Sequence, residues 1–166
     1  MPTLFIDADA CPVTREAIDC ARKARIPCVV VADSGHNLLK HVRANDPTEP
    51  RGGFWVRTIS VQQGQDSADF AIVCELEPDD VVVTQDLGLA AMVLGRGARA
   101  IGVRGEVYDK YTIDALLLVR HAEKEARRNP RRHSTPKGGP RQFSNANRRH
   151  FVTQLEGLLK DCASTH

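Results

Sequence analysis

The stretch Leu4–Val13, LFIDADACPV, joins a short apolar run to two aspartates one residue apart, Asp7 and Asp9. The run favours a buried β-strand, and Pro12 suits the first turn of a helix that apolar spacing extends to Arg25. The two aspartates at this junction have two explanations. They are short polar residues that end a strand and begin a helix, or they are ligands of a metal ion.

The same alternation of strand and helix continues along the chain. Most of the apolar runs are continuous rather than alternating, which is typical of parallel strands buried on both faces. The sequence therefore predicts an α/β fold, a parallel-sheet three-layer sandwich. Further strands are expected at 26–32, 54–61, 80–84 and 99–103, and helices at 66–76, 87–97, 112–128 and 145–162.

The length of 166 residues suggests one domain, and an apolar share of 42% is enough for a sizeable core. We expect residues 1–127 to form the α/β domain. Residues 128–166 are expected to form a basic linker, rich in Pro and Gly, and a C-terminal helix that packs on the same domain. Its apolar stripe consists of Phe151, Leu155, Leu158 and Leu159.

Charge is distributed unevenly along the chain. Residues 1–119 carry 12 Lys and Arg against 17 Asp and Glu, a net charge of −5, whereas residues 120–166 carry 11 against 4, a net charge of +7. An acidic body with a basic tail indicates a polyanionic partner such as nucleic acid, although a solvated helix face followed by a linker has the same composition. The candidate nucleic-acid-binding residues are Arg131, Arg132, Lys137, Arg148 and Arg149.

No stretch is long and apolar enough to span a bilayer, and residues 1–25 carry too many charges for a secretory signal. The five cysteines are odd in number and form no CxxC motif, so reduced thiols are expected. These features predict a cytoplasmic protein with no membrane partner.

Acidic residues follow several of the predicted strands. In an open α/β sheet the ligand-binding crevice lies beyond the carboxyl ends of the strands, so these acids should meet at one edge. Any one of them is also explained as a helix cap or a first-turn residue. The set comprises Asp7, Asp9, Asp33, Asp66, Asp69 and Asp86.

Carboxylates that meet at one edge would repel one another unless a cation neutralised them. Mg²⁺ or Mn²⁺ suits ligation by carboxylates and water, whereas Zn²⁺ prefers His and Cys. Such ions lower the pKa of bound water and clamp phosphoryl oxygens. The cluster therefore indicates metal-dependent phosphodiester hydrolysis, for which a basic tail would suit the substrate.

Five motifs, DADACPV, GQDSADFAIV, VVVTQDLGLA, GVRGEVY and KGGPRQFSNANRRHF, together resemble the YaiI/YqxD family of bacterial proteins over nearly the whole chain. That family is similar to the PIN-like domains, many of which are metal-dependent ribonucleases. The resemblance implies a PIN-like fold, Mg²⁺ or Mn²⁺, and RNA rather than DNA as substrate.

The resemblance also implies roles for particular residues. Asp7, Asp66 or Asp69, and Asp86 would be the catalytic acids, and Asp7, Asp9, Asp69 and Asp86 the metal ligands. One departure is that the late motif usually carries an acid before its arginine, where this chain has Asn147 before Arg148.

Two alternatives remain open. FIDADACPV also resembles the first motif of haloacid-dehalogenase-type phosphatases, which would make Asp7 a nucleophile and Asp9 a general acid. That class requires a Ser or Thr after a second strand, which Ser34 could supply, and a lysine, for which Lys110 is a weak substitute. The other alternative is a non-catalytic nucleic-acid-binding adaptor, which a metal titration would separate from a nuclease.

Overall fold

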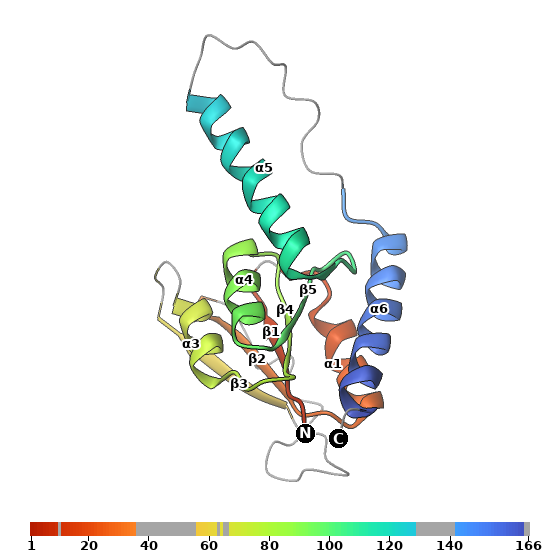
Figure 1. Ribbon diagram of the computed structural model, residues 1–166. Coiled ribbons are helices and arrows are strands. Elements are labelled where there is room, and N and C mark those ends of the chain that lie inside the picture. Colours follow the sequence, from red (N-terminus) through yellow and green to blue (C-terminus); the bar gives the residue numbers. More distant parts are fainter. Residues whose placement is uncertain (10, 36–55, 63, 65–66, 129–141, 165–166) are drawn as a thin grey trace.

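A central sheet lies between two layers of helices in the computed structural model, which describes residues 1–9, 11–35, 56–62, 64, 67–128 and 142–164 (Figure 1). This arrangement confirms the predicted α/β three-layer architecture. The strands are β1 (Leu4–Asp7), β2 (Cys28–Asp33), β3 (Val56–Val61), β4 (Val81–Val83), β5 (Arg99–Ile101) and β6 (Val107–Tyr108). The helices are α1 (Thr14–Ala24), α3 (Ser67–Glu75), α4 (Leu87–Gly95), α5 (Lys110–Arg128) and α6 (Asn145–Ser164).

The strands occur in the order β3-β2-β1-β4-β5-β6, so the first strand of the chain lies inside the sheet. β1 pairs in parallel with β2 on one side and with β4 on the other, and Ile6 stands opposite Val30 and Val83. β3 and β5 extend the parallel sheet outward, and β6 pairs antiparallel with β5.

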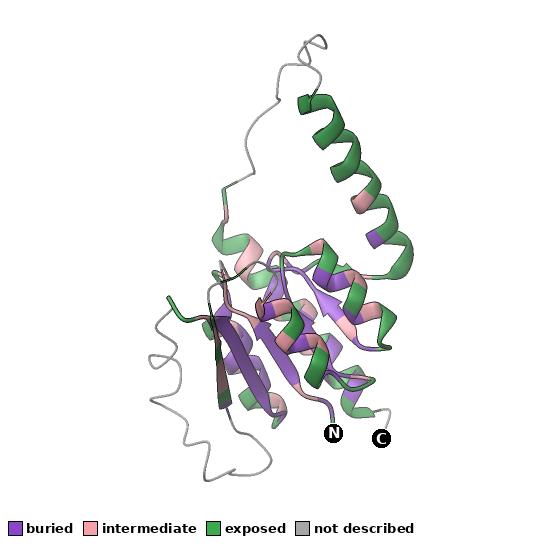
Figure 2. Cartoon of the chain, turned by 90° about the vertical axis from the view of Figure 1, so that its left-hand side faces the viewer, coloured by how far each residue is buried: buried purple, intermediate pink, exposed green. Residues whose placement is uncertain are grey.

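Successive residues of the central strands enter two separate apolar cores. Leu4 and Ile6 pack in the core beneath α1 and α6, while Phe5 packs in the core beneath α3 and α4. Side chains of a strand alternate between the two faces of its sheet, so a strand covered on both faces must be apolar throughout. Figure 2 shows this arrangement as buried strands enclosed by helices with exposed outer faces.

α1 and α6 cover one face of the sheet. α1 ends where Arg25 adopts a left-handed conformation with φ of 57°, and its amide donates to the carbonyls of Ala21 and Arg22. α6 packs against α1 through the predicted stripe, which the structure confirms as buried: Phe151, Leu155, Leu158 and Leu159.

α5 begins against α4 and then extends away from the layers (Figures 1 and 2). Ile113 in its first turn is buried, whereas residues farther along are mostly exposed, and Leu118 is 71% exposed. Among the described helices, none has both the length and the apolar character needed to cross a bilayer.

The sequence does not predict β6, because it has two residues and one of them, Val107, is largely exposed. A tight turn joins it to β5, in which Gly105 has a φ of +94° and its amide donates to the carbonyl of Gly102. A Cβ atom on Gly105 would lie 2.6 Å from Cδ2 of His150. Glycine is therefore required here both by the backbone conformation and by the close approach of α6.

Candidate active site at the carboxyl edge of the sheet

The site lies where the sheet changes direction. From β1 the chain continues outward to β2 and β3, and from β4 it continues outward to β5 on the other side. The adjacent carboxyl ends of β1 and β4 therefore form a topological switch point, the usual place for ligands in open α/β sheets. Asp7 is the last residue of β1, and Asp86 follows β4 by three residues.

A cavity of about 610 Å³ opens at this edge. The predicted acids come to it from four different junctions: β1 to α1, the end of β2, the start of α3, and β4 to α4. Asp66 lies outside the described residues. The charged residues that line the cavity are Asp7, Asp9, Asp33, Asp69, Asp86 and Arg120.

Asp7, at the end of β1, is a half-buried carboxylate of this cavity. Burial raises its pKa from 3.8 to about 6, and the negative charges of Asp69 and Asp9 add to the rise. A hydrogen bond from Oγ1 of Thr84 to Oδ2 of Asp7, 2.8 Å long, opposes part of this effect. The carboxylate is thus held close to other negative charges in a place where its own charge is unfavourable.

Thr84 connects the two strands at the switch point. Its side chain is fully buried at the end of β4, and Oγ1 accepts a 3.0 Å hydrogen bond from the amide of Asp86 while donating to Asp7. Sequence reasoning overlooked Thr84, although a hydroxyl at the end of the apolar run VVV was a signal.

The other acids also have the structural roles that make aspartate common at such junctions. Oδ1 of Asp86 caps α4 by accepting from the amides of Gly88 and Leu89 at 2.7 and 3.2 Å. The two oxygens of Asp9 accept from the amide of Asp33 at 3.1 and 3.3 Å, which joins the β1–α1 loop to the end of β2. Capping and a place in the cavity are therefore compatible.

The donor set suits a hard divalent cation in type, because it consists of carboxylate oxygens. Among the described residues, no three His, Cys, Asp or Glu side chains stand in positions that could hold one ion together. The predicted ligands Asp7, Asp9, Asp69 and Asp86 line one cavity without forming a ready-made ion site.

Arg120 was not anticipated as a site residue. It lies in α5, more than thirty residues after the last acid of the cluster, and reaches the cavity because α5 begins against α4. The sequence of α5 shows an amphipathic helix with several basic residues and offers no signal that distinguishes this one.

The candidate nucleic-acid-binding residues have different settings. Arg131, Arg132 and Lys137 lie outside the described residues. Arg149 is exposed on α6. Nη1 of Arg148 lies 2.6 Å from Oε1 of Glu16 and donates to the carbonyl of Pro12 at 2.7 Å.

Phe143 and Asn147 complete the contacts around Arg148. The guanidinium of Arg148 lies 5.1 Å from the centre of the Phe143 ring, and that of Arg104 lies 5.7 Å from it. Oδ1 of Asn147, in the position where the resemblance led us to expect an acid, accepts from Arg104 and from the amide and hydroxyl of Ser144, each at 3.0 Å. The start of α6 is thereby attached to the β5–β6 turn and to the start of α1.

Among the described residues, no lysine of the kind that a haloacid-dehalogenase-type phosphatase needs lines the acidic cavity. Lys110, the first residue of α5, lines a separate cavity with Ala91, Leu94 and Ile113. The position of Lys110 thus offers no support for that alternative.

A model of the family described as uncharacterised, YaiI/YqxD, matches residues 5–161. Similar proteins include a UPF0178 protein of Lachnoclostridium phytofermentans, 31% identical over 97% of this chain and 99% of the relative. A UPF0178 protein of Bordetella parapertussis is 35% identical over 98% and 92%, and one of Exiguobacterium sibiricum is 40% identical over 84% and 86%. Their names state no activity. No solved structure gives a significant match.

Proposed function

This chain belongs to the YaiI/YqxD family, and we propose that it is a metal-dependent nuclease that hydrolyses phosphodiester bonds, in RNA rather than DNA. The observation that carries the proposal is the meeting of Asp7, Asp9, Asp69 and Asp86 in one cavity at the switch point of the sheet, with Arg120 in the same lining. The resemblance to PIN-like ribonucleases supports RNA as the substrate.

The acidic side chains of the cavity would bind the cation, and the basic side chain would bind the phosphate. Asp7, Asp9, Asp69 and Asp86 would hold Mg²⁺ or Mn²⁺, and Asp66 is the further acid that the resemblance implies. The bound ion would lower the pKa of a water molecule and neutralise developing charge on the phosphoryl oxygens. Arg120 would bind a non-bridging phosphate oxygen, because a guanidinium matches phosphate geometry.

The raised pKa of Asp7 supports a role in binding a cation. A carboxylate whose negative charge is disfavoured by burial and by Asp69 and Asp9 gains more from a divalent cation than an exposed one does. A group in a cavity whose pKa is strongly perturbed by burial and by specific charges is a candidate for a functional role. Thr84 would keep Asp7 in one orientation through its 2.8 Å hydrogen bond.

The basic stretch within 128–149 would attract the nucleic acid toward a body whose net charge is −5 over residues 1–119. With about three to five phosphate contacts, log affinity should fall with log salt at a slope of about −2 to −3.5 for a single strand. The changes that should flatten this slope without a change in metal affinity are those of Arg131, Arg132 and Arg149 to Ser; Arg148, which the sequence also predicted to bind nucleic acid, is left out because Glu16 engages it. An unaltered slope would show that the stretch is a solvated linker.

The proposed compartment is the cytoplasm, whose reducing conditions suit the free cysteines.

The proposal is tested by incubating the metal-free protein with single-stranded RNA and DNA oligonucleotides, with and without Mn²⁺ or Mg²⁺. We expect cleavage of RNA that requires the metal and is lost in Asp7→Asn, because this change removes a charged ligand and keeps its shape. Asp114→Asn, on the exposed part of α5, is the matched control and should retain activity. Metal-independent binding without cleavage would support the adaptor alternative, and hydrolysis of p-nitrophenyl phosphate alone would support the phosphatase.

A further inference from the structure

A second cavity of about 450 Å³ adjoins the acidic cavity, and Asp69 and Asp86 line both. It lies between α3 and α4, and the rest of its lining is Phe70, Val73, Gly88 and Met92. Apart from the two shared carboxylates, this lining carries no charged side chain. A ligand that extends from the acidic cavity across Asp69 and Asp86 would therefore pass from a charged to an apolar surface.

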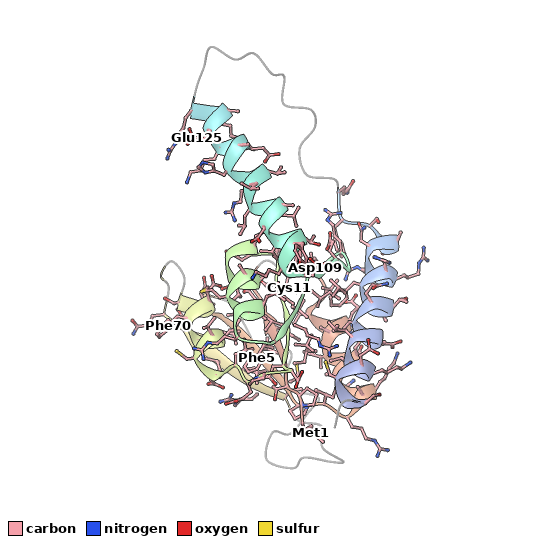
Figure 3. The ribbon with its side chains drawn as sticks, viewed as in Figure 1. Met1, Phe5, Cys11, Phe70, Asp109 and Glu125 are labelled. Atoms are coloured by element: carbon pink, nitrogen blue, oxygen red, sulfur yellow. The ribbon has the colours of Figure 1, made fainter. Side chains whose placement is uncertain are left out.

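Phe70 is placed unusually for a phenylalanine in a short helix on the sheet. The neighbouring residues Ala68 and Ile72 point into the core and are buried, while Phe70 is 72% exposed. Figure 3 shows Phe70 on the outer edge of α3, on the side of the molecule away from α6. Met92 of α4, which lines the same cavity, is 45% exposed. Two large apolar side chains thus remain in contact with water beside the acids.

Building on the proposed function, we infer that Phe70 is a stacking platform for one nucleobase of a single-stranded substrate, next to the phosphodiester in the acidic cavity. Every base has an apolar face that stacks on an aromatic ring, whereas a phosphate would be repelled by Asp69 and Asp86 and would find no cation in this lining. A base inside a duplex is already stacked on both faces, so the platform selects unpaired nucleotides.

Phe70 directly follows Asp69 in α3, which places the stacking ring beside the proposed metal site. The ring is attached to the same helical turn as a carboxylate of the proposed centre, so a base held by the ring fixes the backbone beside it. Met92 would contact the same base from the α4 side, because a thioether adapts to irregular apolar surfaces. The occupant of the apolar cavity is thus part of the strand that enters the acidic cavity.

The test measures binding of single-stranded RNA oligonucleotides to the full-length chain in Ca²⁺, which carboxylates bind, and a gel checks that the oligonucleotide stays intact. Stacking of one base contributes ~1–3 kcal/mol, so Phe70→Ala should weaken binding about 5-fold to 150-fold. Phe70→Trp should retain the affinity, and Phe70→Leu, which stays apolar without a ring face, should lose most of it. Tyr111→Ala is the matched control: it removes an aromatic side chain that is 86% exposed on α5 and does not line the cavity.

A scan of oligonucleotides that each carry one abasic position identifies the stacked base. In the unmodified chain one position should be sensitive, and in Phe70→Ala that sensitivity should disappear, because the two changes remove the same contact. If both chains respond equally at every position, the inference is wrong, even where metal-dependent cleavage upholds the proposed function. If Phe70→Ala instead only changes the oligomeric state in sedimentation, Phe70 belongs to a contact between two copies of the chain. Absence of any binding or cleavage would overturn both proposals.

Discussion

Replacing Asp7 by asparagine is expected to stabilise the metal-free protein while abolishing its proposed activity. Folding raises the pKa of Asp7 from 3.8 to about 6, mainly through burial. The folded protein therefore binds this proton more tightly than the unfolded chain, so the contribution of Asp7 to stability is full at low pH and declines as pH rises. Asparagine has nearly the same shape, carries no charge, and can still accept the hydrogen bond from Thr84.

The size of the effect follows from the shift. A change of one pKa unit corresponds to 1.36 kcal/mol, so raising the pKa of Asp7 from 3.8 to about 6 lowers the stability of the folded protein by ~3 kcal/mol above pH 7. By linkage, the stability gap between Asp7→Asn and the unmodified chain should decline to about half by pH 5, to about a fifth at pH 4, and nearly vanish by about pH 3. Urea unfolding followed by far-ultraviolet circular dichroism, in EDTA, measures this gap directly.

Asp114→Asn, at an exposed position of α5, should show no such gap and serves as the control. Adding Mn²⁺ should reverse the order, because a cation bound by the native state stabilises the chain that retains the ligand. If folded Asp7→Asn is no more stable than the unmodified chain at pH 8 in EDTA, burial does not destabilise the charged form of Asp7.

Three further substitutions probe other parts of the structure. Asp86→Ala should lower the free energy of unfolding by ~1 kcal/mol through loss of the α4 cap, whereas Asp86→Ser should keep the cap and still lose metal-dependent cleavage; equal stability of the two variants would contradict the capping role. Gly105→Ala should lower the free energy of unfolding by more than ~1 kcal/mol, since φ at this position is positive and the added Cβ would meet His150; an unchanged urea midpoint would contradict this. Arg148→Ala should destabilise the protein by about 1 kcal/mol through its contacts with Glu16, while Arg149→Ala should leave thermal unfolding unchanged, and equal effects would remove the distinction.

The alternation of strands and helices could be predicted because burial on both faces requires continuous apolar strands. Val29 and Val30 pack in opposite cores, and the continuous apolar run around them in the sequence reflects the need for apolar side chains on both faces of the strand. The positions of Asp7 and Asp86 at strand ends could be predicted in the same way. β6 could not, because a two-residue strand is defined by its pairing with β5 and has no periodicity of its own.

The site residues that could not be predicted are positioned by contacts between segments that are far apart in the sequence. Arg120 reaches the acidic cavity through the packing of α5 on α4, which depends on the strand order rather than on any local pattern. Arg148 resembles a free basic residue in the sequence, yet Glu16 and the carbonyl of Pro12, far away along the chain, engage it. Charge composition indicates that basic residues gather, and it does not distinguish those that pair within the fold from those left for a partner.

The strand order also has a consequence during synthesis of the chain. β1 is made first, but its neighbour β4 begins at Val81, so a nascent chain that has completed β1, α1, β2 and β3 presents β1 as an open edge. Unpaired amides and carbonyls on an apolar edge strand favour association with other chains. Fragments that end before β4 should therefore aggregate, and the bond between Asp7 and Thr84 can form only after this edge has closed.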